Sequence, residues 1–264
     1  MKFHRKKLPY KLLERISSSV NPFTAINDNT YSPVEGVPII FAVNHSNMHD
    51  FPTSFHAVGQ HAYVLLAEQT FGIIEKVFFF FAGMVMTDRM DRNDTAKAKA
   101  KLTKLLQEGK TILWFPEGTW NLTANLLMLP MKWGIVDAAK STGAQIIPVA
   151  MEYDYTSMIC TVRFGQPMFG TALDKKDEAI RDLRDAMATL RWDLISRAPA
   201  IKNDEIDREK LKEEAQKVLD EYRPEDWERE LSTIFEPYEQ VETVPSDMLP
   251  RRENAFLFSK AWNG

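Results

Sequence analysis

The chain has 264 residues, of which 44% are hydrophobic and 27% are charged, and its net charge is -4 at pH 7. This size and apolar content suit one large α/β domain with an appendage. The single cysteine, Cys160, excludes an internal disulfide framework and a cysteine-based zinc ribbon, so an oxidising compartment is not indicated. The mildly acidic balance, without a recurring basic stripe, disfavours nucleic-acid binding.

Residues 1–36 form a basic N-terminal segment, in which a helix is predicted from Pro9 onward because proline suits a first helical position. Residues 1–15 hold six lysines and arginines against one glutamate. Such a segment can lie on an anionic membrane surface, with each cation contributing about 1 kcal/mol, although a solvated helix explains the same composition. No apolar core of a signal peptide is present, and the longest apolar run, residues 77–86, is too short to cross a membrane. We expect a cytoplasmic protein that can attach peripherally to the inner face of the membrane through residues 1–20.

Residues 37–198 alternate short apolar runs with helical patterns, which predicts an α/β domain built on a mainly parallel central sheet flanked by helices. The apolar runs have the length of strands and are rich in branched or aromatic residues. The helical segments place leucines on one face and charged residues on the other. The predicted strands are residues 37–43, 62–68, 83–89, 111–117, 144–153 and 158–168, and the predicted helices are residues 94–108, 132–141 and 174–197.

Residues 199–264 are predicted to form a charged helical C-terminal extension to this domain. A helix is expected at about residues 204–222, followed by an acidic tail that contains prolines. Residues 202–230 hold seven basic and twelve acidic side chains, which is typical of a solvated surface. Aromatic residues in the rest of the extension indicate that part of it packs.

Polar residues gather where three of the predicted strands end. The first strand runs into residues 44–50, the third into residues 88–89 and the fourth into residues 117–119. In a parallel sheet the carboxyl ends of the strands lie at one edge, and ligands bind in the crevice beyond them. Polar residues follow most strands, so their position alone is weak support for a functional site. The prediction of a site therefore depends on which residue types are present.

His45 and Asp50 are the residues of this group that suit acid–base chemistry. Residues five apart on a helix point roughly 140° apart, so the two side chains meet only if His45 precedes a helix and Asp50 lies in its first turns. The carboxylate would then hold one ring nitrogen and leave the other to take a proton from a hydroxyl. The chain has no Gly-x-Ser-x-Gly nucleophile motif, and Cys160 lies in a predicted strand. The pair therefore suits an enzyme whose substrate brings the hydroxyl, as in acyl transfer to an alcohol.

Four sequence blocks resemble the motifs of the glycerolipid acyltransferase family, whose best-known members are lysophosphatidic acid (1-acylglycerol-3-phosphate) acyltransferases. NHSNMHD at residues 44–50 is similar to the family's Asn-His-x-x-x-x-Asp motif, and FPEGT at residues 115–119 is similar to its third motif. GMVMTDR at residues 83–89 resembles the second motif, and IIPVAM at residues 146–151 resembles the fourth. The blocks follow the family's order at similar spacing over roughly residues 37–170.

The resemblance implies an acyltransferase that moves an acyl chain from acyl-CoA or acyl carrier protein to a hydroxyl of a lysophospholipid or glycerol-phosphate-like acceptor. His45 would be the general base that activates this hydroxyl, and Asp50 would orient it. Backbone N–H groups near His45, at the start of the following helix, are expected to stabilise the oxyanion. No metal or organic cofactor is implied, because the thioester of the donor brings the activation.

The resemblance also assigns five residues to the binding of the acceptor. Arg89 would hold its phosphate or another anionic head group, since a guanidinium binds such groups with a forked pair of donors. Glu117, Gly118 and Thr119 would line the acceptor pocket, with Gly118 allowing close approach of the backbone. Lys132 is similar to a lysine that the family often has near the acceptor phosphate.

Three other interpretations use the same residues. His45 and His49, with Asp50 or His56, have a spacing that a metal site can use. A thioesterase would employ the same pair to give the acyl group to water, and a lipid-binding scaffold would bind without catalysis. Trp120 stands where the family frequently has arginine or serine, which favours an acceptor other than simple lysophosphatidic acid.

Two apolar runs, residues 78–81 and 125–131, have either a structural or a functional explanation. As core residues they would pack between the sheet and its helices. As functional residues they would contact an acyl chain or the membrane beside the site.

Overall fold

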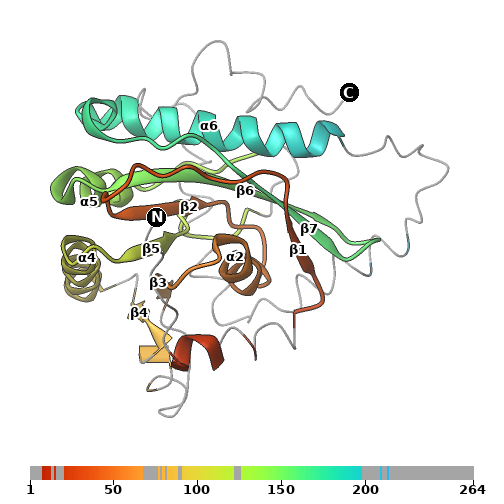
Figure 1. Ribbon diagram of the computed structural model, residues 1–264, viewed down its shortest axis with the longest axis horizontal. Helices are drawn as coiled ribbons and strands as arrows, with labels where there is room; N and C mark the ends of the chain where they lie inside the picture. The colour runs from red at the N-terminus through yellow and green to blue at the C-terminus, as the bar shows by residue number, and fades with distance from the viewer. Residues whose placement is uncertain are drawn as a thin grey trace.

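The computed structural model describes residues 8–12, 15, 21–67, 77, 79–80, 82–88, 91–121, 126–197, 209 and 213. Strands and helices alternate along most of this chain (Figure 1). The strands are β1 (Thr24–Asn27), β2 (Ile39–Val43), β3 (Ala62–Ala67), β4 (Met84–Thr87), β5 (Thr111–Trp114), β6 (Gln145–Asp154) and β7 (Ile159–Phe164). The helices are α2 (Asp50–Val58), α4 (Arg92–Gln107), α5 (Gly134–Thr142) and α6 (Lys176–Arg197), with a 3-10 turn, η1 (Gly170–Leu173).

The described strands form one seven-stranded sheet in the order β1-β7-β6-β2-β5-β3-β4. Every neighbouring pair is parallel except β6 and β7, which are antiparallel. This confirms the predicted α/β fold with a mainly parallel sheet flanked by helices. β2 lies in the middle of the sheet, between β6 and β5, so the residues that follow it emerge at the centre of the sheet's edge.

Both faces of the sheet are covered because the side chains of β2 alternate between two apolar cores. Ile40 and Ala42 pack with side chains of α4, α5 and α6 on one face. Phe41 and Val43 pack with side chains of α2 on the other face. Burial on both faces explains why the central strands are continuous apolar runs in the sequence rather than alternating ones.

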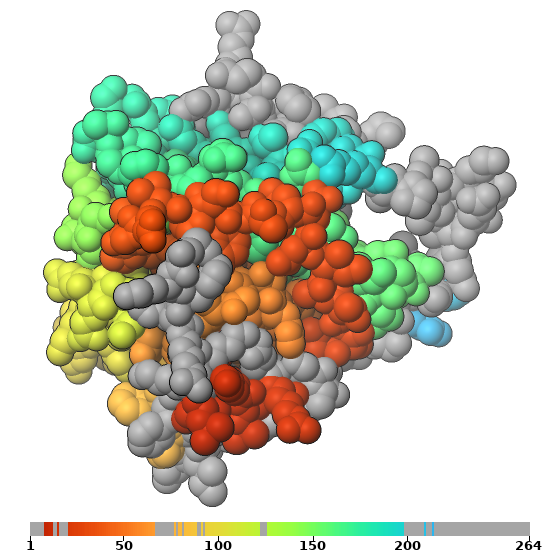
Figure 2. All heavy atoms as spheres, viewed as in Figure 1, coloured from red at the N-terminus to blue at the C-terminus, as the bar shows by residue number. Residues whose placement is uncertain are grey.

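β1 is a strand that the sequence analysis did not predict. Its residues fall inside the segment 1–36, which was expected to be helical, but they pair in parallel with β7. The sheet thus begins at Thr24, before residue 37, where the predicted α/β domain begins. Figure 2 shows the residues that lead from β1 to β2, in red-orange, spread across the face of the molecule between α6 and α2. The strand escaped prediction because it is a four-residue edge strand whose side chains are mostly exposed, so it has no apolar pattern.

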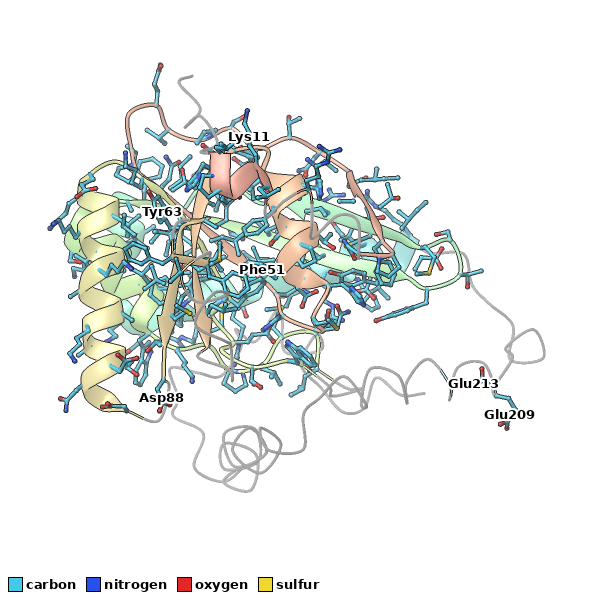
Figure 3. All side chains as sticks on the ribbon, turned by 90° about the horizontal axis from the view of Figure 1, so that it is seen from below. Lys11, Phe51, Tyr63, Asp88, Glu209 and Glu213 are labelled. Carbon is cyan, nitrogen blue, oxygen red and sulfur yellow. The ribbon has the colours of Figure 1, made fainter. Side chains whose placement is uncertain are left out.

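A helical turn at residues 8–12 precedes this strand and packs on α2. Tyr10 is fully buried, with its ring centroid 4.8 Å from that of Phe55, and its hydroxyl donates to the carbonyl of Gln60 at 3.3 Å. Figure 3 shows Lys11 of this turn and Asp88, which follows β4, at opposite ends of the sheet. The N-terminal helical turn therefore lies at the amino-terminal ends of the strands, away from the edge where the polar residues gather.

The two apolar runs divide between core and surface. Met128 and Met131 are 1% and 2% exposed and belong to the core beneath α5 and α6, so their loop packs into the protein. Phe79 packs partly against the other core, whereas Phe80 is 57% exposed. Among residues 8–197 as far as they are described, no helix is both long and apolar enough to cross a membrane. The predicted C-terminal extension lies outside the described residues, apart from two helical positions at 209 and 213.

The side chain of Gln145 connects the segment before β2 to the sheet. It is fully buried; its amide nitrogen donates to the carbonyls of Val34 at 2.9 Å and Val37 at 3.1 Å, and its oxygen accepts from the N–H of Val34 at 2.8 Å. Replacing Gln145 by leucine leaves these backbone groups without partners. We expect Gln145→Leu to lower the free energy of unfolding by about 1–3 kcal/mol in urea titrations. The same change at the exposed Gln166 is the control and should stay within about 0.5 kcal/mol; equal effects of the two variants would contradict the assignment.

Candidate active site

His45 and Asp50 meet at the carboxyl end of β2. His45 lies in the loop after the strand, and Asp50 is the first residue of α2. Nδ1 of His45 lies 2.8 Å from Oδ2 of Asp50, and the two side chains are 17% and 0% exposed. This is the geometry that the five-residue spacing predicted, with the histidine in the turn and the aspartate in the first helical turn.

The carboxylate of Asp50 is held by its own loop. Its Oδ2 accepts from the backbone N–H groups of Ser46 and of Asn47, the latter at 2.9 Å, and its Oδ1 accepts from the hydroxyl of Ser46 at 3.2 Å. An ionised carboxylate can only accept hydrogen bonds, so the Nδ1 of His45 that faces it carries the proton. In the neutral ring the other nitrogen, Nε2, then carries no proton and can take one up.

The loop after β5 fixes the rest of His45. Its N–H donates to Oε1 of Glu117 at 2.8 Å, and its carbonyl accepts from the N–H of Asn121 at 2.7 Å. Its ring stacks on that of Phe115 with centroids 4.3 Å apart and planes 24° apart, and the ring of Trp120 meets it edge-on at 6.0 Å. Both the backbone and the ring of His45 are thus held by residues 115–121.

Glu117 connects two loops rather than facing open space. It is 3% exposed; Oε1 accepts from His45, and Oε2 accepts from the N–H of Leu129 at 2.8 Å. Burial raises the pKa of the Glu117 carboxyl to about 7, and the two backbone donors and the positive charge of Arg191 offset part of that rise. The structure therefore places Glu117 as a clamp behind the His45–Asp50 pair.

Gly118 and Lys132 lie side by side on the outer side of this clamp. Gly118 has φ +73°, and a Cβ there would stand 3.0 Å from Cε and 3.1 Å from Nζ of Lys132, so the glycine makes room for the lysine. Lys132 is exposed, and its own N–H donates to the carbonyl of Pro116 at 2.9 Å. Thr119 is buried, and Arg89 lies outside the described residues.

Further residues hold the site in place, and Asn44, the first residue of the Asn-His-x-x-x-x-Asp block, is one of them. The side chain of Asn44 donates to the carbonyl of Met151 at 3.1 Å and accepts from its N–H at 2.7 Å, which joins the end of β2 to β6. Asn121, Leu129 and Arg191 also contact the site's loops, and these three were not predicted. No signal in the sequence distinguishes these residues from ordinary surface or loop positions, because each acts through a backbone contact far along the chain.

Cys160 and His49 are the side chains that a cysteine nucleophile or a metal site would use. Cys160 is fully buried, and burial raises the pKa of its thiol well above the ordinary value, so it is not an activated nucleophile. The ring of His49 packs edge-on against that of Phe23, with centroids 5.2 Å apart. Across the part of the chain that the structure describes, no three His, Cys, Asp or Glu residues are grouped so that they could hold a metal ion.

The raised pKa of Glu117 predicts a pH-dependent stability. The folded-state pKa of about 7 exceeds the ordinary value of 4.5, so the stability that Glu117 contributes is fully present below pH 4.5 and is lost as the pH rises through about 7. The loss amounts to roughly 3 kcal/mol. Glu117→Gln cannot ionise, so urea titrations should show the stability of the natural chain falling relative to this variant over that range. Parallel stability curves for the two proteins would show that Glu117 titrates normally.

Comparisons with known proteins identify relatives of this chain. The family model "Acyltransferase" matches residues 24–152, which include the His45–Asp50 pair and the Glu117 clamp. A 1-acyl-sn-glycerol-3-phosphate acyltransferase of Chlamydomonas reinhardtii is 28% identical over 45% of this chain and 35% of that protein. One from Haemophilus influenzae is 32% identical over 42% of this chain and 46% of that protein. The chain thus spans between a third and a half of the length of these curated relatives.

A solved structure shares the fold. The crystal structure of the 1-acyl-sn-glycerophosphate acyltransferase of Thermotoga maritima superposes with a TM-score of 0.55 at 15% identity, over 73% of this chain and 81% of that one. At this identity the likeness concerns the fold. The matched family model shows that residues 24–152 form a domain of the acyltransferase family, and the curated relatives that this chain resembles are 1-acyl-sn-glycerol-3-phosphate acyltransferases.

Proposed function

We propose that this chain transfers an acyl group from acyl-CoA or acyl carrier protein to the hydroxyl of a lysophosphatidate-like acceptor, with His45 as the general base. The observation that carries the proposal is the contact of 2.8 Å between His45 and Asp50, which leaves Nε2 unprotonated at the carboxyl end of a central strand. The names of the relatives, 1-acyl-sn-glycerol-3-phosphate acyltransferases, support the class of acceptor.

The proposed reaction needs no nucleophile from the protein. Nε2 of His45 takes the proton of the acceptor hydroxyl while the hydroxyl oxygen attacks the carbonyl carbon of the thioester. The carbon–sulfur bond then breaks, and the leaving thiolate receives the proton from the imidazolium. Asp50 stays ionised throughout and stabilises the imidazolium, as the carboxylate does in a Ser-His-Asp triad. The buried, unactivated thiol of Cys160 fits a reaction in which the substrate supplies the nucleophile.

The oxyanion donors expected next to His45 are occupied by other acceptors. The N–H groups of Ser46 and Asn47 donate to Asp50, and that of His49 donates to the side-chain oxygen of Asn47 at 2.8 Å. These three N–H groups hold the loop and the carboxylate, so an oxyanion would have to be bound by other donors in this conformation of the loop.

Lys132 is the described basic residue that suits the acceptor's phosphate. Its ammonium lies against Gly118, directly after the glutamate that holds His45, and it is exposed. An ammonium at this place can neutralise a phosphate while the acceptor's hydroxyl reaches His45. Arg89, which follows β4, is the second proposed phosphate ligand. Because such an acceptor is a lipid, a membrane surface is the expected partner of the chain.

Acyl transfer tests the role of His45 directly. Purified protein is incubated with labelled palmitoyl-CoA, or with palmitoyl acyl carrier protein, and with lysophosphatidic acid, other lysophospholipids, glycerol phosphate or simple alcohols. Acylated product and free thiol are followed by mass spectrometry. His45→Ala should lower the rate of transfer by at least about 10²-fold, the usual contribution of a general base, and Asp50→Asn should act in the same direction. The matched control is His56→Ala, since His56 is an exposed histidine on the same loop–helix unit.

Each outcome separates the proposal from its alternatives. Transfer that survives in His45→Ala would refute the proposed mechanism. Thiol release that yields only free fatty acid would assign a thioesterase. The absence of turnover with both donors and every acceptor would favour a lipid-binding scaffold. Activity that a chelator abolishes would revive the metal interpretation of the histidines.

Replacing Lys132 tests the acceptor site separately from the chemistry. Lys132→Met should raise the KM for lysophosphatidic acid about tenfold, the equivalent of about 1.4 kcal/mol, with kcat nearly unchanged, since the ammonium binds substrate and transition state alike. Gly118→Ala should act in the same direction, because the added methyl group displaces the ammonium of Lys132. A neutral alcohol acceptor serves as the control and should show no change; an equal loss with both acceptors would argue against phosphate binding by Lys132.

A further inference from the structure

Arg191 is a largely buried cation on α6 that contacts the loop behind the candidate site. It lies beyond residues 24–152, which the acyltransferase family model matches, and it belongs to none of the four sequence blocks. Its side chain is 16% exposed. Nε donates to Oε2 of Glu152 on β6 at 2.9 Å, and Nη1 donates to the carbonyl of Leu127 at 2.8 Å.

The position of Arg191 on its helix is one where a hydrophobic residue would be expected. Leu183 and Met187 lie eight and four residues before it, on the same face of α6, and both are fully buried in the core against the sheet. A charged group at such a position is costly to bury unless it is paired and hydrogen-bonded. Its contacts with Glu152 and Leu127 meet that requirement, and the second of them is with the loop that supports the site.

A short series of contacts leads from Arg191 to the general base. Arg191 holds the carbonyl of Leu127, and two residues later the N–H of Leu129 donates to Glu117 at 2.8 Å. Glu117 in turn accepts from the N–H of His45 at 2.8 Å. Three hydrogen bonds and two residues of chain thus connect the guanidinium to the backbone of His45.

Asn121 supports the same loop by an independent contact. Its side chain donates to the carbonyl of Leu126 at 2.8 Å, and its own N–H donates to the carbonyl of His45 at 2.7 Å. The loop at residues 126–129 is therefore held on one side by Arg191 and on the other by residues that grip His45.

The positive charge of Arg191 also acts on the carboxylate of Glu117, which its hydrogen bond to Leu127 reaches through Leu129. Burial raises the pKa of the Glu117 carboxyl, and the positive charge of Arg191 opposes that rise. The ionised carboxylate is the stronger acceptor from the two backbone N–H groups, since protonation turns one oxygen into a donor and weakens it as an acceptor. Arg191 thereby favours the form of Glu117 that can fasten both loops.

We propose that Arg191 is a positioning residue of the site, which holds residues 126–129 against Glu117 and thereby fixes the backbone of His45. This inference rests on the proposed acyl transfer. Arg191 does not touch the reacting atoms; it acts through Leu127, Leu129 and Glu117.

The test compares two arginines of α6. Arg191→Met removes the buried cation, and Arg197→Met removes an exposed one, 54% accessible, that pairs with Asp28 at 3.1 Å. The rate of acyl transfer from palmitoyl-CoA to lysophosphatidic acid is measured between about pH 5.5 and pH 9. Arg191→Met should lower kcat by about 10–100-fold, the equivalent of about 1.4–3 kcal/mol, with KM for either substrate changed little. Arg197→Met should behave like the natural chain.

The pH profile separates positioning from a merely structural role. Without the positive charge, Glu117 stays protonated to a higher pH, so the loss of activity on the acid side should move to higher pH in Arg191→Met. Arg191→Lys restores the charge but not the forked pair of contacts, since an ammonium lacks the guanidinium geometry. It should return the acid side of the profile to that of the natural chain while kcat stays reduced by about 3–10-fold, the equivalent of about 0.6–1.4 kcal/mol.

Several results would overturn the inference. One is an unchanged kcat and pH profile in Arg191→Met; another is a uniform loss of activity without a shift of the profile, which would make the residue structural. If Arg191→Met does not fold in circular dichroism, Arg191→Lys decides the matter, and a kcat equal to that of the natural chain would refute the positioning role.

A measurement of stability keeps this inference distinct from the proposed function. In urea titrations, Arg191→Lys should leave unchanged the pH range over which Glu117 destabilises the protein. Arg191→Met should move this pH range to higher pH. In a double-mutant cycle, Arg191→Met should cause no such shift when Glu117→Gln is also present. An inactive natural chain would refute the proposed function, but these stability measurements on the Arg191 and Glu117 variants could still be interpreted. If the natural chain is active but Arg191→Met does not shift the pH range over which Glu117 destabilises the protein, only the inference about Arg191 is refuted.

Discussion

The carboxylate of Glu117 is the contact on which the rest of the site depends. Its two oxygens join the backbone of His45 to that of Leu129, so it ties together the loop after β2 and the loop before α5. The pairing of β2 with β5 makes this possible, because the register that sets Ala42 opposite Trp114 brings the residues after both strands to the same place. A buried carboxylate between two backbone donors is rigid, and rigidity is what a general base requires.

The site also concentrates charge in a volume from which water is largely excluded. Asp50 and Glu117 are both buried, and the negative charge of Asp50 raises the pKa of Glu117 further. Each carboxylate is stabilised differently, Asp50 by the donors of its own loop, and Glu117 by two backbone N–H groups and by the positive charge of Arg191 on α6. Because Glu117 titrates near neutral pH while it holds His45, stability and activity should respond to pH in opposite ways: ionisation weakens the fold but strengthens the clamp.

The parts of the fold that could be predicted from sequence are those whose signal lies within one element. The central strands show as apolar runs because both of their faces are buried, and α4 and α6 show through their amphipathic spacing. β1 could not be predicted, because an exposed four-residue edge strand has no pattern of its own and exists only through its pairing with β7. The loop that carries Met128 was ambiguous for a related reason, since its apolar residues fit either a core or a lipid contact, and only packing beneath α5 and α6 decides between them.

The amino-acid sequence alone was enough for the mainly parallel sheet and for the His45–Asp50 pair, because both follow from short-range rules: periodicity in the first case and a spacing of five residues in the second. The roles of Glu117 and Arg191 were decided by tertiary structure. Glu117 reaches His45 across 72 residues of chain and Arg191 reaches Leu127 across 64. Contacts of that range are set by strand order and by the packing of a helix on the sheet, and such contacts leave no local pattern in the sequence.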